Sequence, residues 1–435
     1  MAIQNNQNLK VLIVGSGLAG LTAARVLREH HAVTIYERGG VAVATGGQGI
    51  MIAGNGNRIL TPLGYEGEGA RVGGVPIHRL RMFDDKNHQI QDTVMDLKAR
   101  FGTDILGQKR SDFRDELVRL ATAPSAELGI GGEPATVVYN QAVVGIDPEE
   151  GVVTFGDGTT AAADVIVVAD GIHSRLRPLV AGEGAPKPQK TGHLAYRVAV
   201  SVEAANRALA EANMKPPVWW RPEMFNNTTL VLNGPPGSCR VAMAYPLRRN
   251  TYFNFSCIME TRVSSRRTTE SWHADGDRDE MLEYFGWDEG LKRILGSATE
   301  VKCWDLQDLD PLPTWTKGRA ILIGDAAHAM TPMQGQGANL SIEDAEALRL
   351  LNNEHDAQGT GAKVRREDVP AILRRIDSVR RPRADRALEL VRATHGRFTG
   401  HSKYEDKSDF FMGYSGIYAA LAEKEKGAAK HGEDK

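Results

Sequence analysis

A turn of closely spaced glycines near the start of the chain has the residue types that bind a dinucleotide. The segment GSGLAG places Gly15, Gly17 and Gly20 between an apolar run at 10–14 and a segment at 18–30 whose apolar residues have helical spacing. The first glycine permits the sharp bend, the second lets backbone N–H groups approach a pyrophosphate, and the third lets the helix pack on the strand. The N-terminus of the helix also attracts the phosphate charge. The turn is therefore predicted to bind a dinucleotide, in preference to being merely a tight turn.

An acidic residue follows this turn where a ribose would lie. Glu37 ends the second apolar run, at about the 20-residue spacing from the first glycine at which a carboxylate takes the ribose 2′-OH. A 2′-phosphate would be repelled by this carboxylate. The pocket is therefore predicted to hold NAD or FAD and not NADP.

Two later segments end apolar strands in short polar turns. VIVVADGIHSRLR ends its strand at Asp170, and GRAILIGDAAHAMTPMQGQGANLS ends its strand at Asp325 before a second glycine-rich turn at 335–337. Asp325, at the carboxyl end of its strand, is placed to accept hydrogen bonds from a cofactor, and the glycine turn opens a helix whose amides can face phosphate groups. For Asp170, a lone catalytic acid is an alternative to cofactor binding. His328 has no second candidate metal ligand nearby, which favours a structural role over that of a base or ligand.

Taken in order, these three motifs resemble the fingerprints of the single-component, FAD-dependent aromatic hydroxylases, the para-hydroxybenzoate and salicylate hydroxylase family. Looser resemblance covers residues 10–397. It implies an α/β fold, with a Rossmann-like FAD-binding domain of the para-hydroxybenzoate hydroxylase type, an inserted, mostly antiparallel β-sheet substrate domain and C-terminal helices. The expected ranges are 9–190 and 303–400 for the FAD-binding domain, 191–302 for the substrate domain, and 401–435 for a C-terminal helix and tail.

The resemblance also implies a reaction. FAD would be held tightly but non-covalently, NADH or NADPH would visit transiently, and a flavin C4a-hydroperoxide would insert one oxygen atom of O2 into a phenol or aromatic acid. One alternative uses the same flavin chemistry to epoxidise or rearrange an indole or alkene. More distant alternatives are an NAD-dependent dehydrogenase, which leaves the Asp325 segment unexplained, and a non-catalytic nucleotide-sensing module.

The resemblance assigns cofactor-binding residues to the three motifs and to two further segments. Arg110, in KRSDFRDEL, matches the RxDL arginine that contacts the flavin side of the cofactor, and an ion pair with Asp112 or Asp115 is an equally favoured alternative. Gly49 lies in a glycine-rich stretch that the family lays alongside the flavin ring. The expected cofactor-binding residues are Gly15, Gly17, Leu18, Ala19, Gly20, Glu37, Arg38, Gly49, Arg110, Asp170, Asp325, Gly335, Gly337, Ala338 and Asn339.

The substrate side rests on residues of the expected antiparallel sheet. Arg197 matches an arginine that in relatives binds a phenolate or carboxylate, or polarises an intermediate, and a guanidinium fork suits that task; a solvent-facing strand arginine is the alternative. Gln48 stands where many relatives have a small residue. We expect catalytic roles for Arg197, Gln48 and the backbone of Pro332, and substrate contacts from Arg197, Tyr245 and Trp219, with core packing as the alternative for Trp219.

The composition excludes several kinds of partner. The 435 residues suffice for two domains, and a net charge of −2 argues against a nucleic-acid surface. The three cysteines are far apart in the sequence, which disfavours a disulfide scaffold or a metal cluster and favours a reducing compartment. No apolar run approaches the ~18 residues of a membrane span, and MAIQNNQNLK lacks the pattern of a signal peptide. We expect a cytoplasmic protein without metal, acting as a monomer or homodimer.

The segment at 374–397 is rich in arginine and has helical spacing. Its arginines would either attract the phosphates of NAD(P)H or form a solvated helix face. The interleaved Asp377 and Asp385 favour the solvated face.

Overall fold

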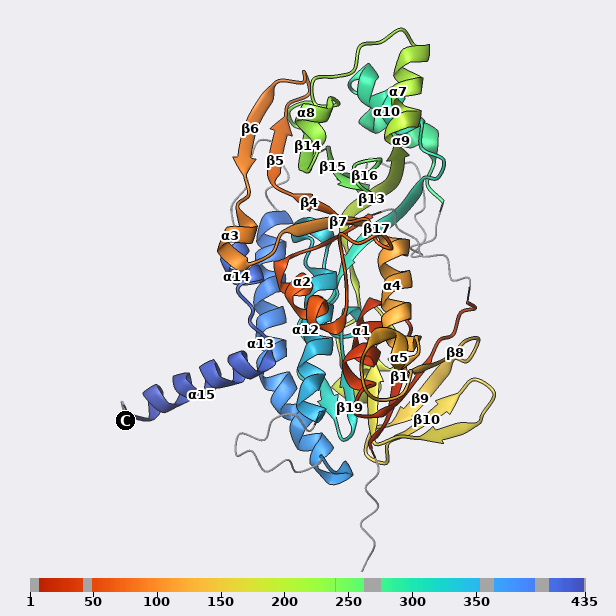
Figure 1. Cartoon of the computed structure of the whole chain (residues 1–435), viewed down its shortest axis with the longest axis vertical. Helices are drawn as coiled ribbons and strands as arrows, with labels where there is room; N and C mark the ends of the chain where they lie inside the picture. Colours follow the sequence, from red (N-terminus) through yellow and green to blue (C-terminus); the bar gives the residue numbers. More distant parts are fainter. Residues whose placement is uncertain are drawn as a thin grey trace, which may run out of the picture.

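Figure 1 shows the protein as a computed structural model, in which residues 8–41, 49–238, 240–261, 275–352, 364–395 and 407–433 are described. A six-stranded sheet organises the lower part of the molecule and a seven-stranded sheet organises the upper part. Across these residues, no helix combines the length and the apolar character needed to cross a membrane.

The six-stranded sheet forms from the apolar runs that the sequence predicts as strands. β1 (Lys10–Val14), β12 (Val165–Val168) and β19 (Ala320–Leu322) are parallel neighbours. Strands of a parallel sheet are covered on both faces, so their residues are nearly all apolar and buried. Their carboxyl ends share one edge, and the three motif turns that follow them therefore lie side by side. The other strands are β18 (Thr316–Lys317), β2 (Ala32–Tyr36) and β8 (Thr136–Val138).

The seven-stranded sheet draws on more of the chain than the sequence predicts. Strands from residues 79–94 join it, although the expected boundary lies at 191, and its last strand runs past the boundary expected at 302. The alternation of residues predicts strands here but cannot name the partner of each strand. The order across the sheet is β17 (Lys302–Asp308), β13 (Gln189–Ser201), β16 (Tyr252–Glu260), β15 (Val241–Leu247), β14 (Thr228–Asn233), β5 (Arg79–Phe83) and β6 (Gln89–Val94).

One face of this sheet carries an aromatic core. Trp219 and Trp220 are each 1% exposed, and the Trp220 ring packs against Phe225, Phe253 and Phe255. Helices cover this core in the upper part of Figure 1. They are α7 (Val202–Glu211), α8 (Pro222–Phe225), α9 (Arg278–Phe285) and α10 (Glu289–Gly296).

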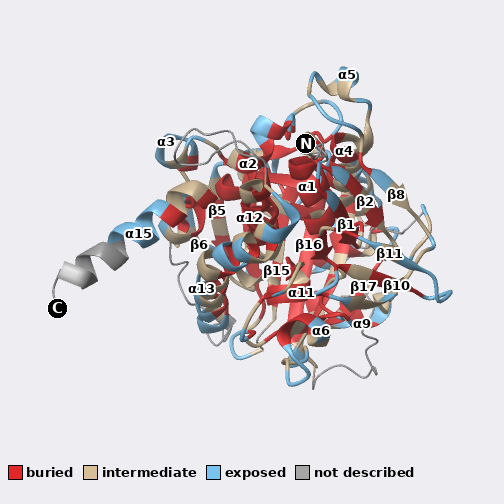
Figure 2. Ribbon diagram, turned by 90° about the horizontal axis from the view of Figure 1, so that it is seen from below, coloured by how far each residue is buried: buried red, intermediate tan, exposed pale blue. Residues whose placement is uncertain are grey.

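Smaller sheets and the remaining helices complete the described chain. Figure 2 shows α1 and α12 within the buried interior and α15 extending into solvent. Helices α14 and α15 lie in the expected C-terminal range, whereas residues 396–406 lie outside the described part. The small sheets are β3 (Gly49–Ile52), β7 (Ile105–Lys109) and β4 (Val75–Ile77), and β11 (Thr160–Ala162), β10 (Val152–Phe155) and β9 (Val143–Asp147). The remaining helices are α1 (Leu18–Leu27), α2 (Gly54–Leu60), α3 (Leu97–Phe101), α4 (Arg110–Thr122), α5 (Ser125–Leu128), α6 (Arg177–Ala181), α11 (Asp325–His328), α12 (Gly337–Ala347), α13 (Val369–His395), α14 (Ser408–Met412) and α15 (Ile417–Glu433), with short 3-10 turns η1 (Thr61–Leu63), η3 (Pro332–Gln334), η4 (Leu348–Leu351) and η5 (Arg366–Asp368).

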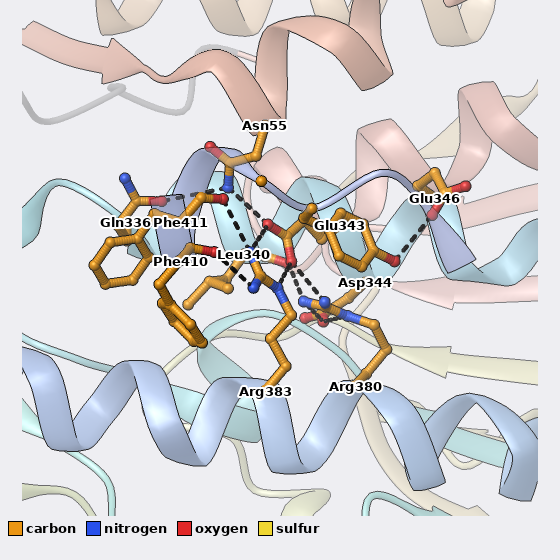
Figure 3. A network of polar contacts seen from close by, with 12 residues as sticks. Asn55, Gln336, Leu340, Glu343, Asp344, Glu346, Arg380, Arg383, Phe410 and Phe411 are labelled. Atoms are coloured by element: carbon orange, nitrogen blue, oxygen red, sulfur yellow. Dashed lines mark hydrogen bonds and ion pairs between the residues drawn. The ribbon is translucent and has the colours of Figure 1, made fainter. Parts of the chain in front are cut away.

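A buried network of charges joins α13 to α12 (Figure 3). Glu343 accepts hydrogen bonds from Arg380 at 2.5 Å and from Arg383 at 2.7 and 2.8 Å. Asp344 accepts from Arg380 at 3.0 Å and lies 2.5 Å from Nε2 of His328. Burial alone would raise the pKa of the Glu343 carboxyl, but the two guanidiniums hold it below its usual value. Both carboxylates are therefore ionised and compensated inside the protein.

The solvated face predicted for the arginine-rich segment is wrong for Arg380, which is fully buried. The sequence shows which aspartates lie on the same helix as Arg380. It does not show that Glu343 and Asp344 of α12 lie beside Arg380 and balance its charge. The interpretation holds for Arg386, whose ion pair with Glu389 has side chains 60% and 65% exposed.

We expect Arg380→Met to destabilise the protein strongly. Removing one side of a buried ion pair leaves a buried charge without its partner, at a cost of about 3–5 kcal/mol. The matched change Arg386→Met removes an exposed pair and should alter the free energy of unfolding by less than about 1 kcal/mol. Urea denaturation of both variants measures the difference, and equal stability would contradict a stabilising role for the network.

Candidate active site

A cavity of about 410 Å³ lies between the carboxyl edge of the six-stranded sheet and the seven-stranded sheet. It brings together residues from all three motifs and from the substrate sheet, although they are spread over more than three hundred positions of the chain. The expected site residues that line it are Gly17, Leu18, Ala19, Glu37, Gly49, Arg110, Arg197, Tyr245, Asp325, Pro332, Gly335, Gly337 and Ala338.

The glycines of the first turn divide into two structural and one open position. Gly15 has a φ of 102°, and a Cβ there would lie 2.5 Å from the carbonyl oxygen of Ala169. A Cβ at Gly20 would lie 2.1 Å from the carbonyl oxygen of Gly15, whereas a Cβ at Gly17 would meet nothing within 4 Å. Gly15 and Gly20 thus let strand and helix pack, and Gly17 faces the cavity, where the pyrophosphate of a cofactor would lie.

Glu37 is fixed in place before any ligand binds. One carboxylate oxygen accepts hydrogen bonds from the backbone N–H of Ser16 at 2.9 Å and from its hydroxyl at 2.8 Å. The other accepts from the N–H of Gly39 at 2.8 Å. This fixed carboxylate at the end of β2 is suited to the hydroxyls of a ribose.

At the other end of the cavity, Arg110 lies among charged groups of both sheets. Burial lowers the pKa of its guanidinium and nearby Asp325 raises it, with Arg197 as a further positive neighbour. Asp112 instead forms a fork with Arg248, with N–O distances of 2.7 and 2.8 Å. Asp112 therefore has Arg248 as its partner, which weighs against the alternative of an ion pair between Asp112 and Arg110.

The register of the upper sheet points Arg197 and Tyr245 at the same cavity. Arg197 pairs with Ser256, and Tyr245 pairs with Asn254. Residues 254 and 256 are two apart on β16, so both pairs share one face of the sheet. Since Trp304 on β17 also lines the cavity, this face forms its roof.

Two hydrogen bonds hold Arg197 in the roof. Its guanidinium donates to the carbonyl oxygen of Gly49 at 3.0 Å and to the hydroxyl of Ser256 at 3.3 Å, and it lies 5.9 Å from the centre of the Trp304 ring. The buried Nε has no partner within the described part of the chain. Burial raises the pKa of Tyr245, against the opposing effect of the two arginines, so its phenol is neutral and can donate a hydrogen bond.

Two expected residues lie just behind the lining. Asn339 accepts a hydrogen bond from the N–H of Ala53 and donates one to Gly335, both at 2.8 Å, and so joins two segments of the cavity wall. Asp170 precedes Gly171, which does line the cavity, and one of its buried oxygens has no partner among the described residues. Burial raises the pKa of this carboxyl.

Two expected residues, Trp219 and Arg38, are not among the residues that line the cavity, and a third lies outside the described part of the chain. Trp219 packs in the aromatic core, where its indole N–H donates to Asn87 at 2.7 Å, because that face of the sheet is the one covered by helices. Arg38 is exposed and is not part of the lining. Gln48 lies outside the described residues, and its role stays a prediction.

Arg114 and Trp304 are among the lining residues that sequence reasoning missed. Arg114 follows Arg110 by four positions on α4, so the two share a helix face. Trp304 belongs to an alternating strand whose register with β13 sets its face. The four-residue spacing from Arg110 could have predicted that Arg114 faces the cavity. The side of the sheet on which Trp304 lies could not be predicted, because it depends on a partner strand distant in sequence.

The fold and the site together define a protein that binds a dinucleotide cofactor. The open space at Gly17, the fixed carboxylate of Glu37 and the unpartnered oxygen of Asp170 fit a dinucleotide that ends beneath the roof. A parallel sheet with its ligand at the carboxyl edge is the usual place for such a cofactor.

Comparison with known proteins gives the family. Residues 8–351 match the family described as FAD binding domain. Hispidin-3-hydroxylase of Neonothopanus nambi is 31% identical over 350 residues, covering 79% of this chain and 80% of that protein. The 3-amino-4-hydroxybenzoate 2-monooxygenase PtmB3 of Streptomyces platensis is 30% identical over 399 residues, covering 90% and 87%. A solved salicylate hydroxylase substrate complex has a TM-score of 0.72 and 25% identity, covering 96% and 98%. The chain belongs to the FAD-dependent aromatic hydroxylase family, and its cofactor is FAD.

Two glycine substitutions should separate packing from cofactor binding. Gly17→Ala adds a methyl group to open space, so we expect unchanged thermal unfolding of the apoprotein and an FAD dissociation constant raised on the order of tenfold or more, because the added methyl group obstructs the pyrophosphate. Gly20→Ala forces the turn apart and should lower the unfolding midpoint by several degrees. Thermal scans and FAD titration measure both effects, and normal FAD binding by Gly17→Ala would contradict this placement of the cofactor.

Proposed function

We propose that this protein hydroxylates an electron-rich aromatic compound that carries a carboxylate or a phenolate, using O2 and NADH or NADPH. The observation that supports this most directly is the pairing of two guanidiniums, Arg110 and Arg197, with the phenol of Tyr245 around one cavity. A bound anion would compensate the positive charge of this cluster. The names of the relatives acting on 3-amino-4-hydroxybenzoate and salicylate fit such a substrate.

Bound FAD would supply the redox chemistry, with NAD(P)H as the reductant and O2 as the source of the transferred oxygen atom. The chain's own part is to bind and orient the substrate. Arg197 is already aimed by its bonds to Gly49 and Ser256, so little conformational freedom remains to be lost when an anion binds. The neutral Tyr245 donates a hydrogen bond to a substrate oxygen.

The roof also keeps bulk water away from the reacting atoms. Trp304 and Leu306 are 7% and 3% exposed and come from β17, beside the strand that carries Arg197. Met51 and Met243 line the same cavity. An apolar lining of this kind strengthens the electrostatic effect of the arginines and limits side reactions with water. The backbone of Pro332 lies in the lining near the glycine turn of α12 and is assigned to the edge of the flavin ring.

The cysteines support the proposed cytoplasmic location. Cys257 and Cys303 are buried and both pair in register with Tyr196, from the strands on either side of it. Two interstrand spacings separate them by about 9–10 Å, which exceeds the reach of a disulfide. Buried cysteines that cannot form a disulfide with each other fit a reducing compartment.

The proposed function is tested by NAD(P)H oxidation with the purified holoenzyme across a panel of phenols, aromatic acids and indoles. We expect one anionic aromatic compound to accelerate the oxidation with little release of peroxide, and its product to carry one additional hydroxyl group. An epoxide or a rearranged product from an indole would indicate that the protein catalyses the alternative reaction instead of hydroxylation. A rate that no compound changes would contradict the proposal.

Arg197 should govern the use of anionic substrates. With the substrate found in that panel, Arg197→Met should lower kcat/KM by about 100-fold, equivalent to about 2.7 kcal/mol, because a charge-assisted hydrogen bond is lost in a cavity with little water. Arg197→Lys restores the charge but not the fork and should recover part of this loss. Arg79→Met is the matched control, since Arg79 lies on the same sheet with its side chain 38% exposed and paired to Asp92. Equal losses in the Arg79 and Arg197 variants would contradict the role of Arg197.

A further inference from the structure

At the end of the cavity that contains Glu37, backbone N–H groups but no side chain have so far been assigned to the two phosphates of FAD. The N-terminus of α1 faces this end, with no side-chain cap and no acidic residue in its first turn. Its partial positive charge is equivalent to about half an elementary charge, whereas a pyrophosphate carries about two negative charges. Glu37 adds a further negative charge beside it. The sequence of residues 39–48 contains no lysine or arginine.

Arg114 is the arginine that lies at this end. Its side chain is 12% exposed, it lines the cavity, and its Nη2 lies 3.5 Å from the hydroxyl of Ser16. That hydroxyl donates to Glu37 at 2.8 Å, which places the guanidinium beside the glycine turn and one hydroxyl away from the ribose carboxylate. Helix α4 holds Arg114 there, because its apolar face, including Phe113 and Leu117, is fully buried.

Within the described part of the chain, the guanidinium of Arg114 has no short ion pair. Among the described residues, its ion-pair partner is Asp115, at 4.0 Å, and the side chain of Asp115 is 74% exposed. Ion pairs that are this long and this exposed contribute little to stability. A cation held in a cavity wall without such a partner is suited to bind an anion.

The other arginines in the lining lie at the flavin end. Arg110 has Asp325, Arg197 and Tyr245 as its charged neighbours, and Arg197 is held by Gly49 and Ser256 in the roof. Arg38, which the sequence suggests for this site, is exposed and outside the lining. Of the arginines in the described lining, Arg114 alone contacts the glycine turn.

We propose that Arg114 binds the pyrophosphate of FAD, together with the N-terminus of α1, and that this contact makes the site favour FAD over riboflavin. The guanidinium fork matches the geometry of phosphate oxygens and keeps its charge at every physiological pH. Riboflavin has the same ring and ribityl chain as FAD but carries no phosphate, whereas FMN retains one of the two phosphates. Loss of Arg114 should therefore weaken the binding of FAD without weakening the binding of riboflavin.

The test compares full-length Arg114→Met, Arg114→Lys and Asp115→Asn with the unchanged protein. Dissociation constants for FAD and for riboflavin are obtained by titrating the apoprotein and following the flavin fluorescence. We expect Arg114→Met to raise the FAD constant by about tenfold or more, and Arg114→Lys to raise it by less, because the charge remains while the fork is lost. Asp115→Asn should leave the FAD constant within about twofold, and every variant should bind riboflavin within about twofold of the unchanged protein.

Three results would overturn the proposal. The first is an unchanged FAD constant in Arg114→Met. The second is an equal loss in Asp115→Asn, which would assign Arg114 to a surface ion pair. The third is an equal weakening of FAD and riboflavin, which would indicate a general distortion of the site. If Arg114→Met does not fold, Arg114→Lys decides by the same comparison of FAD with riboflavin. Because no substrate is used, this test can fail while the proposed hydroxylation stands, and the reverse also holds.

Discussion

The buried ion pairs between α12 and α13 are the constraint on which the cofactor site depends. Glu343 accepts hydrogen bonds from Arg380, Arg383 and Asn55, and Asn55 also donates to Gln336 at 3.3 Å. One carboxylate thus connects the helix after β3, the glycine turn before α12 and the long helix α13 (Figure 3). A buried carboxylate with several charge-assisted partners is costly to disturb. The two walls of the cavity are therefore fixed relative to each other.

The chemistry of the site arises where the two large sheets meet. The parallel sheet supplies a carboxyl edge with the turns that hold FAD, and the antiparallel sheet supplies a roof whose register aims Arg197 and Tyr245 at the same space. Gly49 belongs to both functions, because its carbonyl oxygen anchors Arg197 while its lack of a side chain admits the close approach of Tyr245 and Asn254. Neither sheet alone forms the cavity.

The sequence predicts those features that depend on local spacing, and it fails where long-range partners decide. The strand-turn-helix motifs around Gly17 and Asp325 are local, and the structure places both residues in one cavity. Strands β5 and β6 are distant in sequence from the sheet they join. The burial of Arg380 depends on acids of another helix, and the position of Trp219 depends on which face of its sheet the helices cover. These positions are determined by tertiary packing, which cannot be predicted from the periodicity of the sequence.

The central claim is that the cavity directs one oxygen atom of O2 into an aromatic substrate bound beneath Arg197. Its most direct test is turnover of the holoenzyme under ¹⁸O2, with mass spectrometry of the product and measurement of released peroxide. The structure predicts a hydroxylated product that carries one ¹⁸O atom, formed in step with NAD(P)H oxidation and with little peroxide. A product whose new oxygen comes from water, or NAD(P)H oxidation that yields only peroxide with every anionic aromatic compound, would contradict the claim.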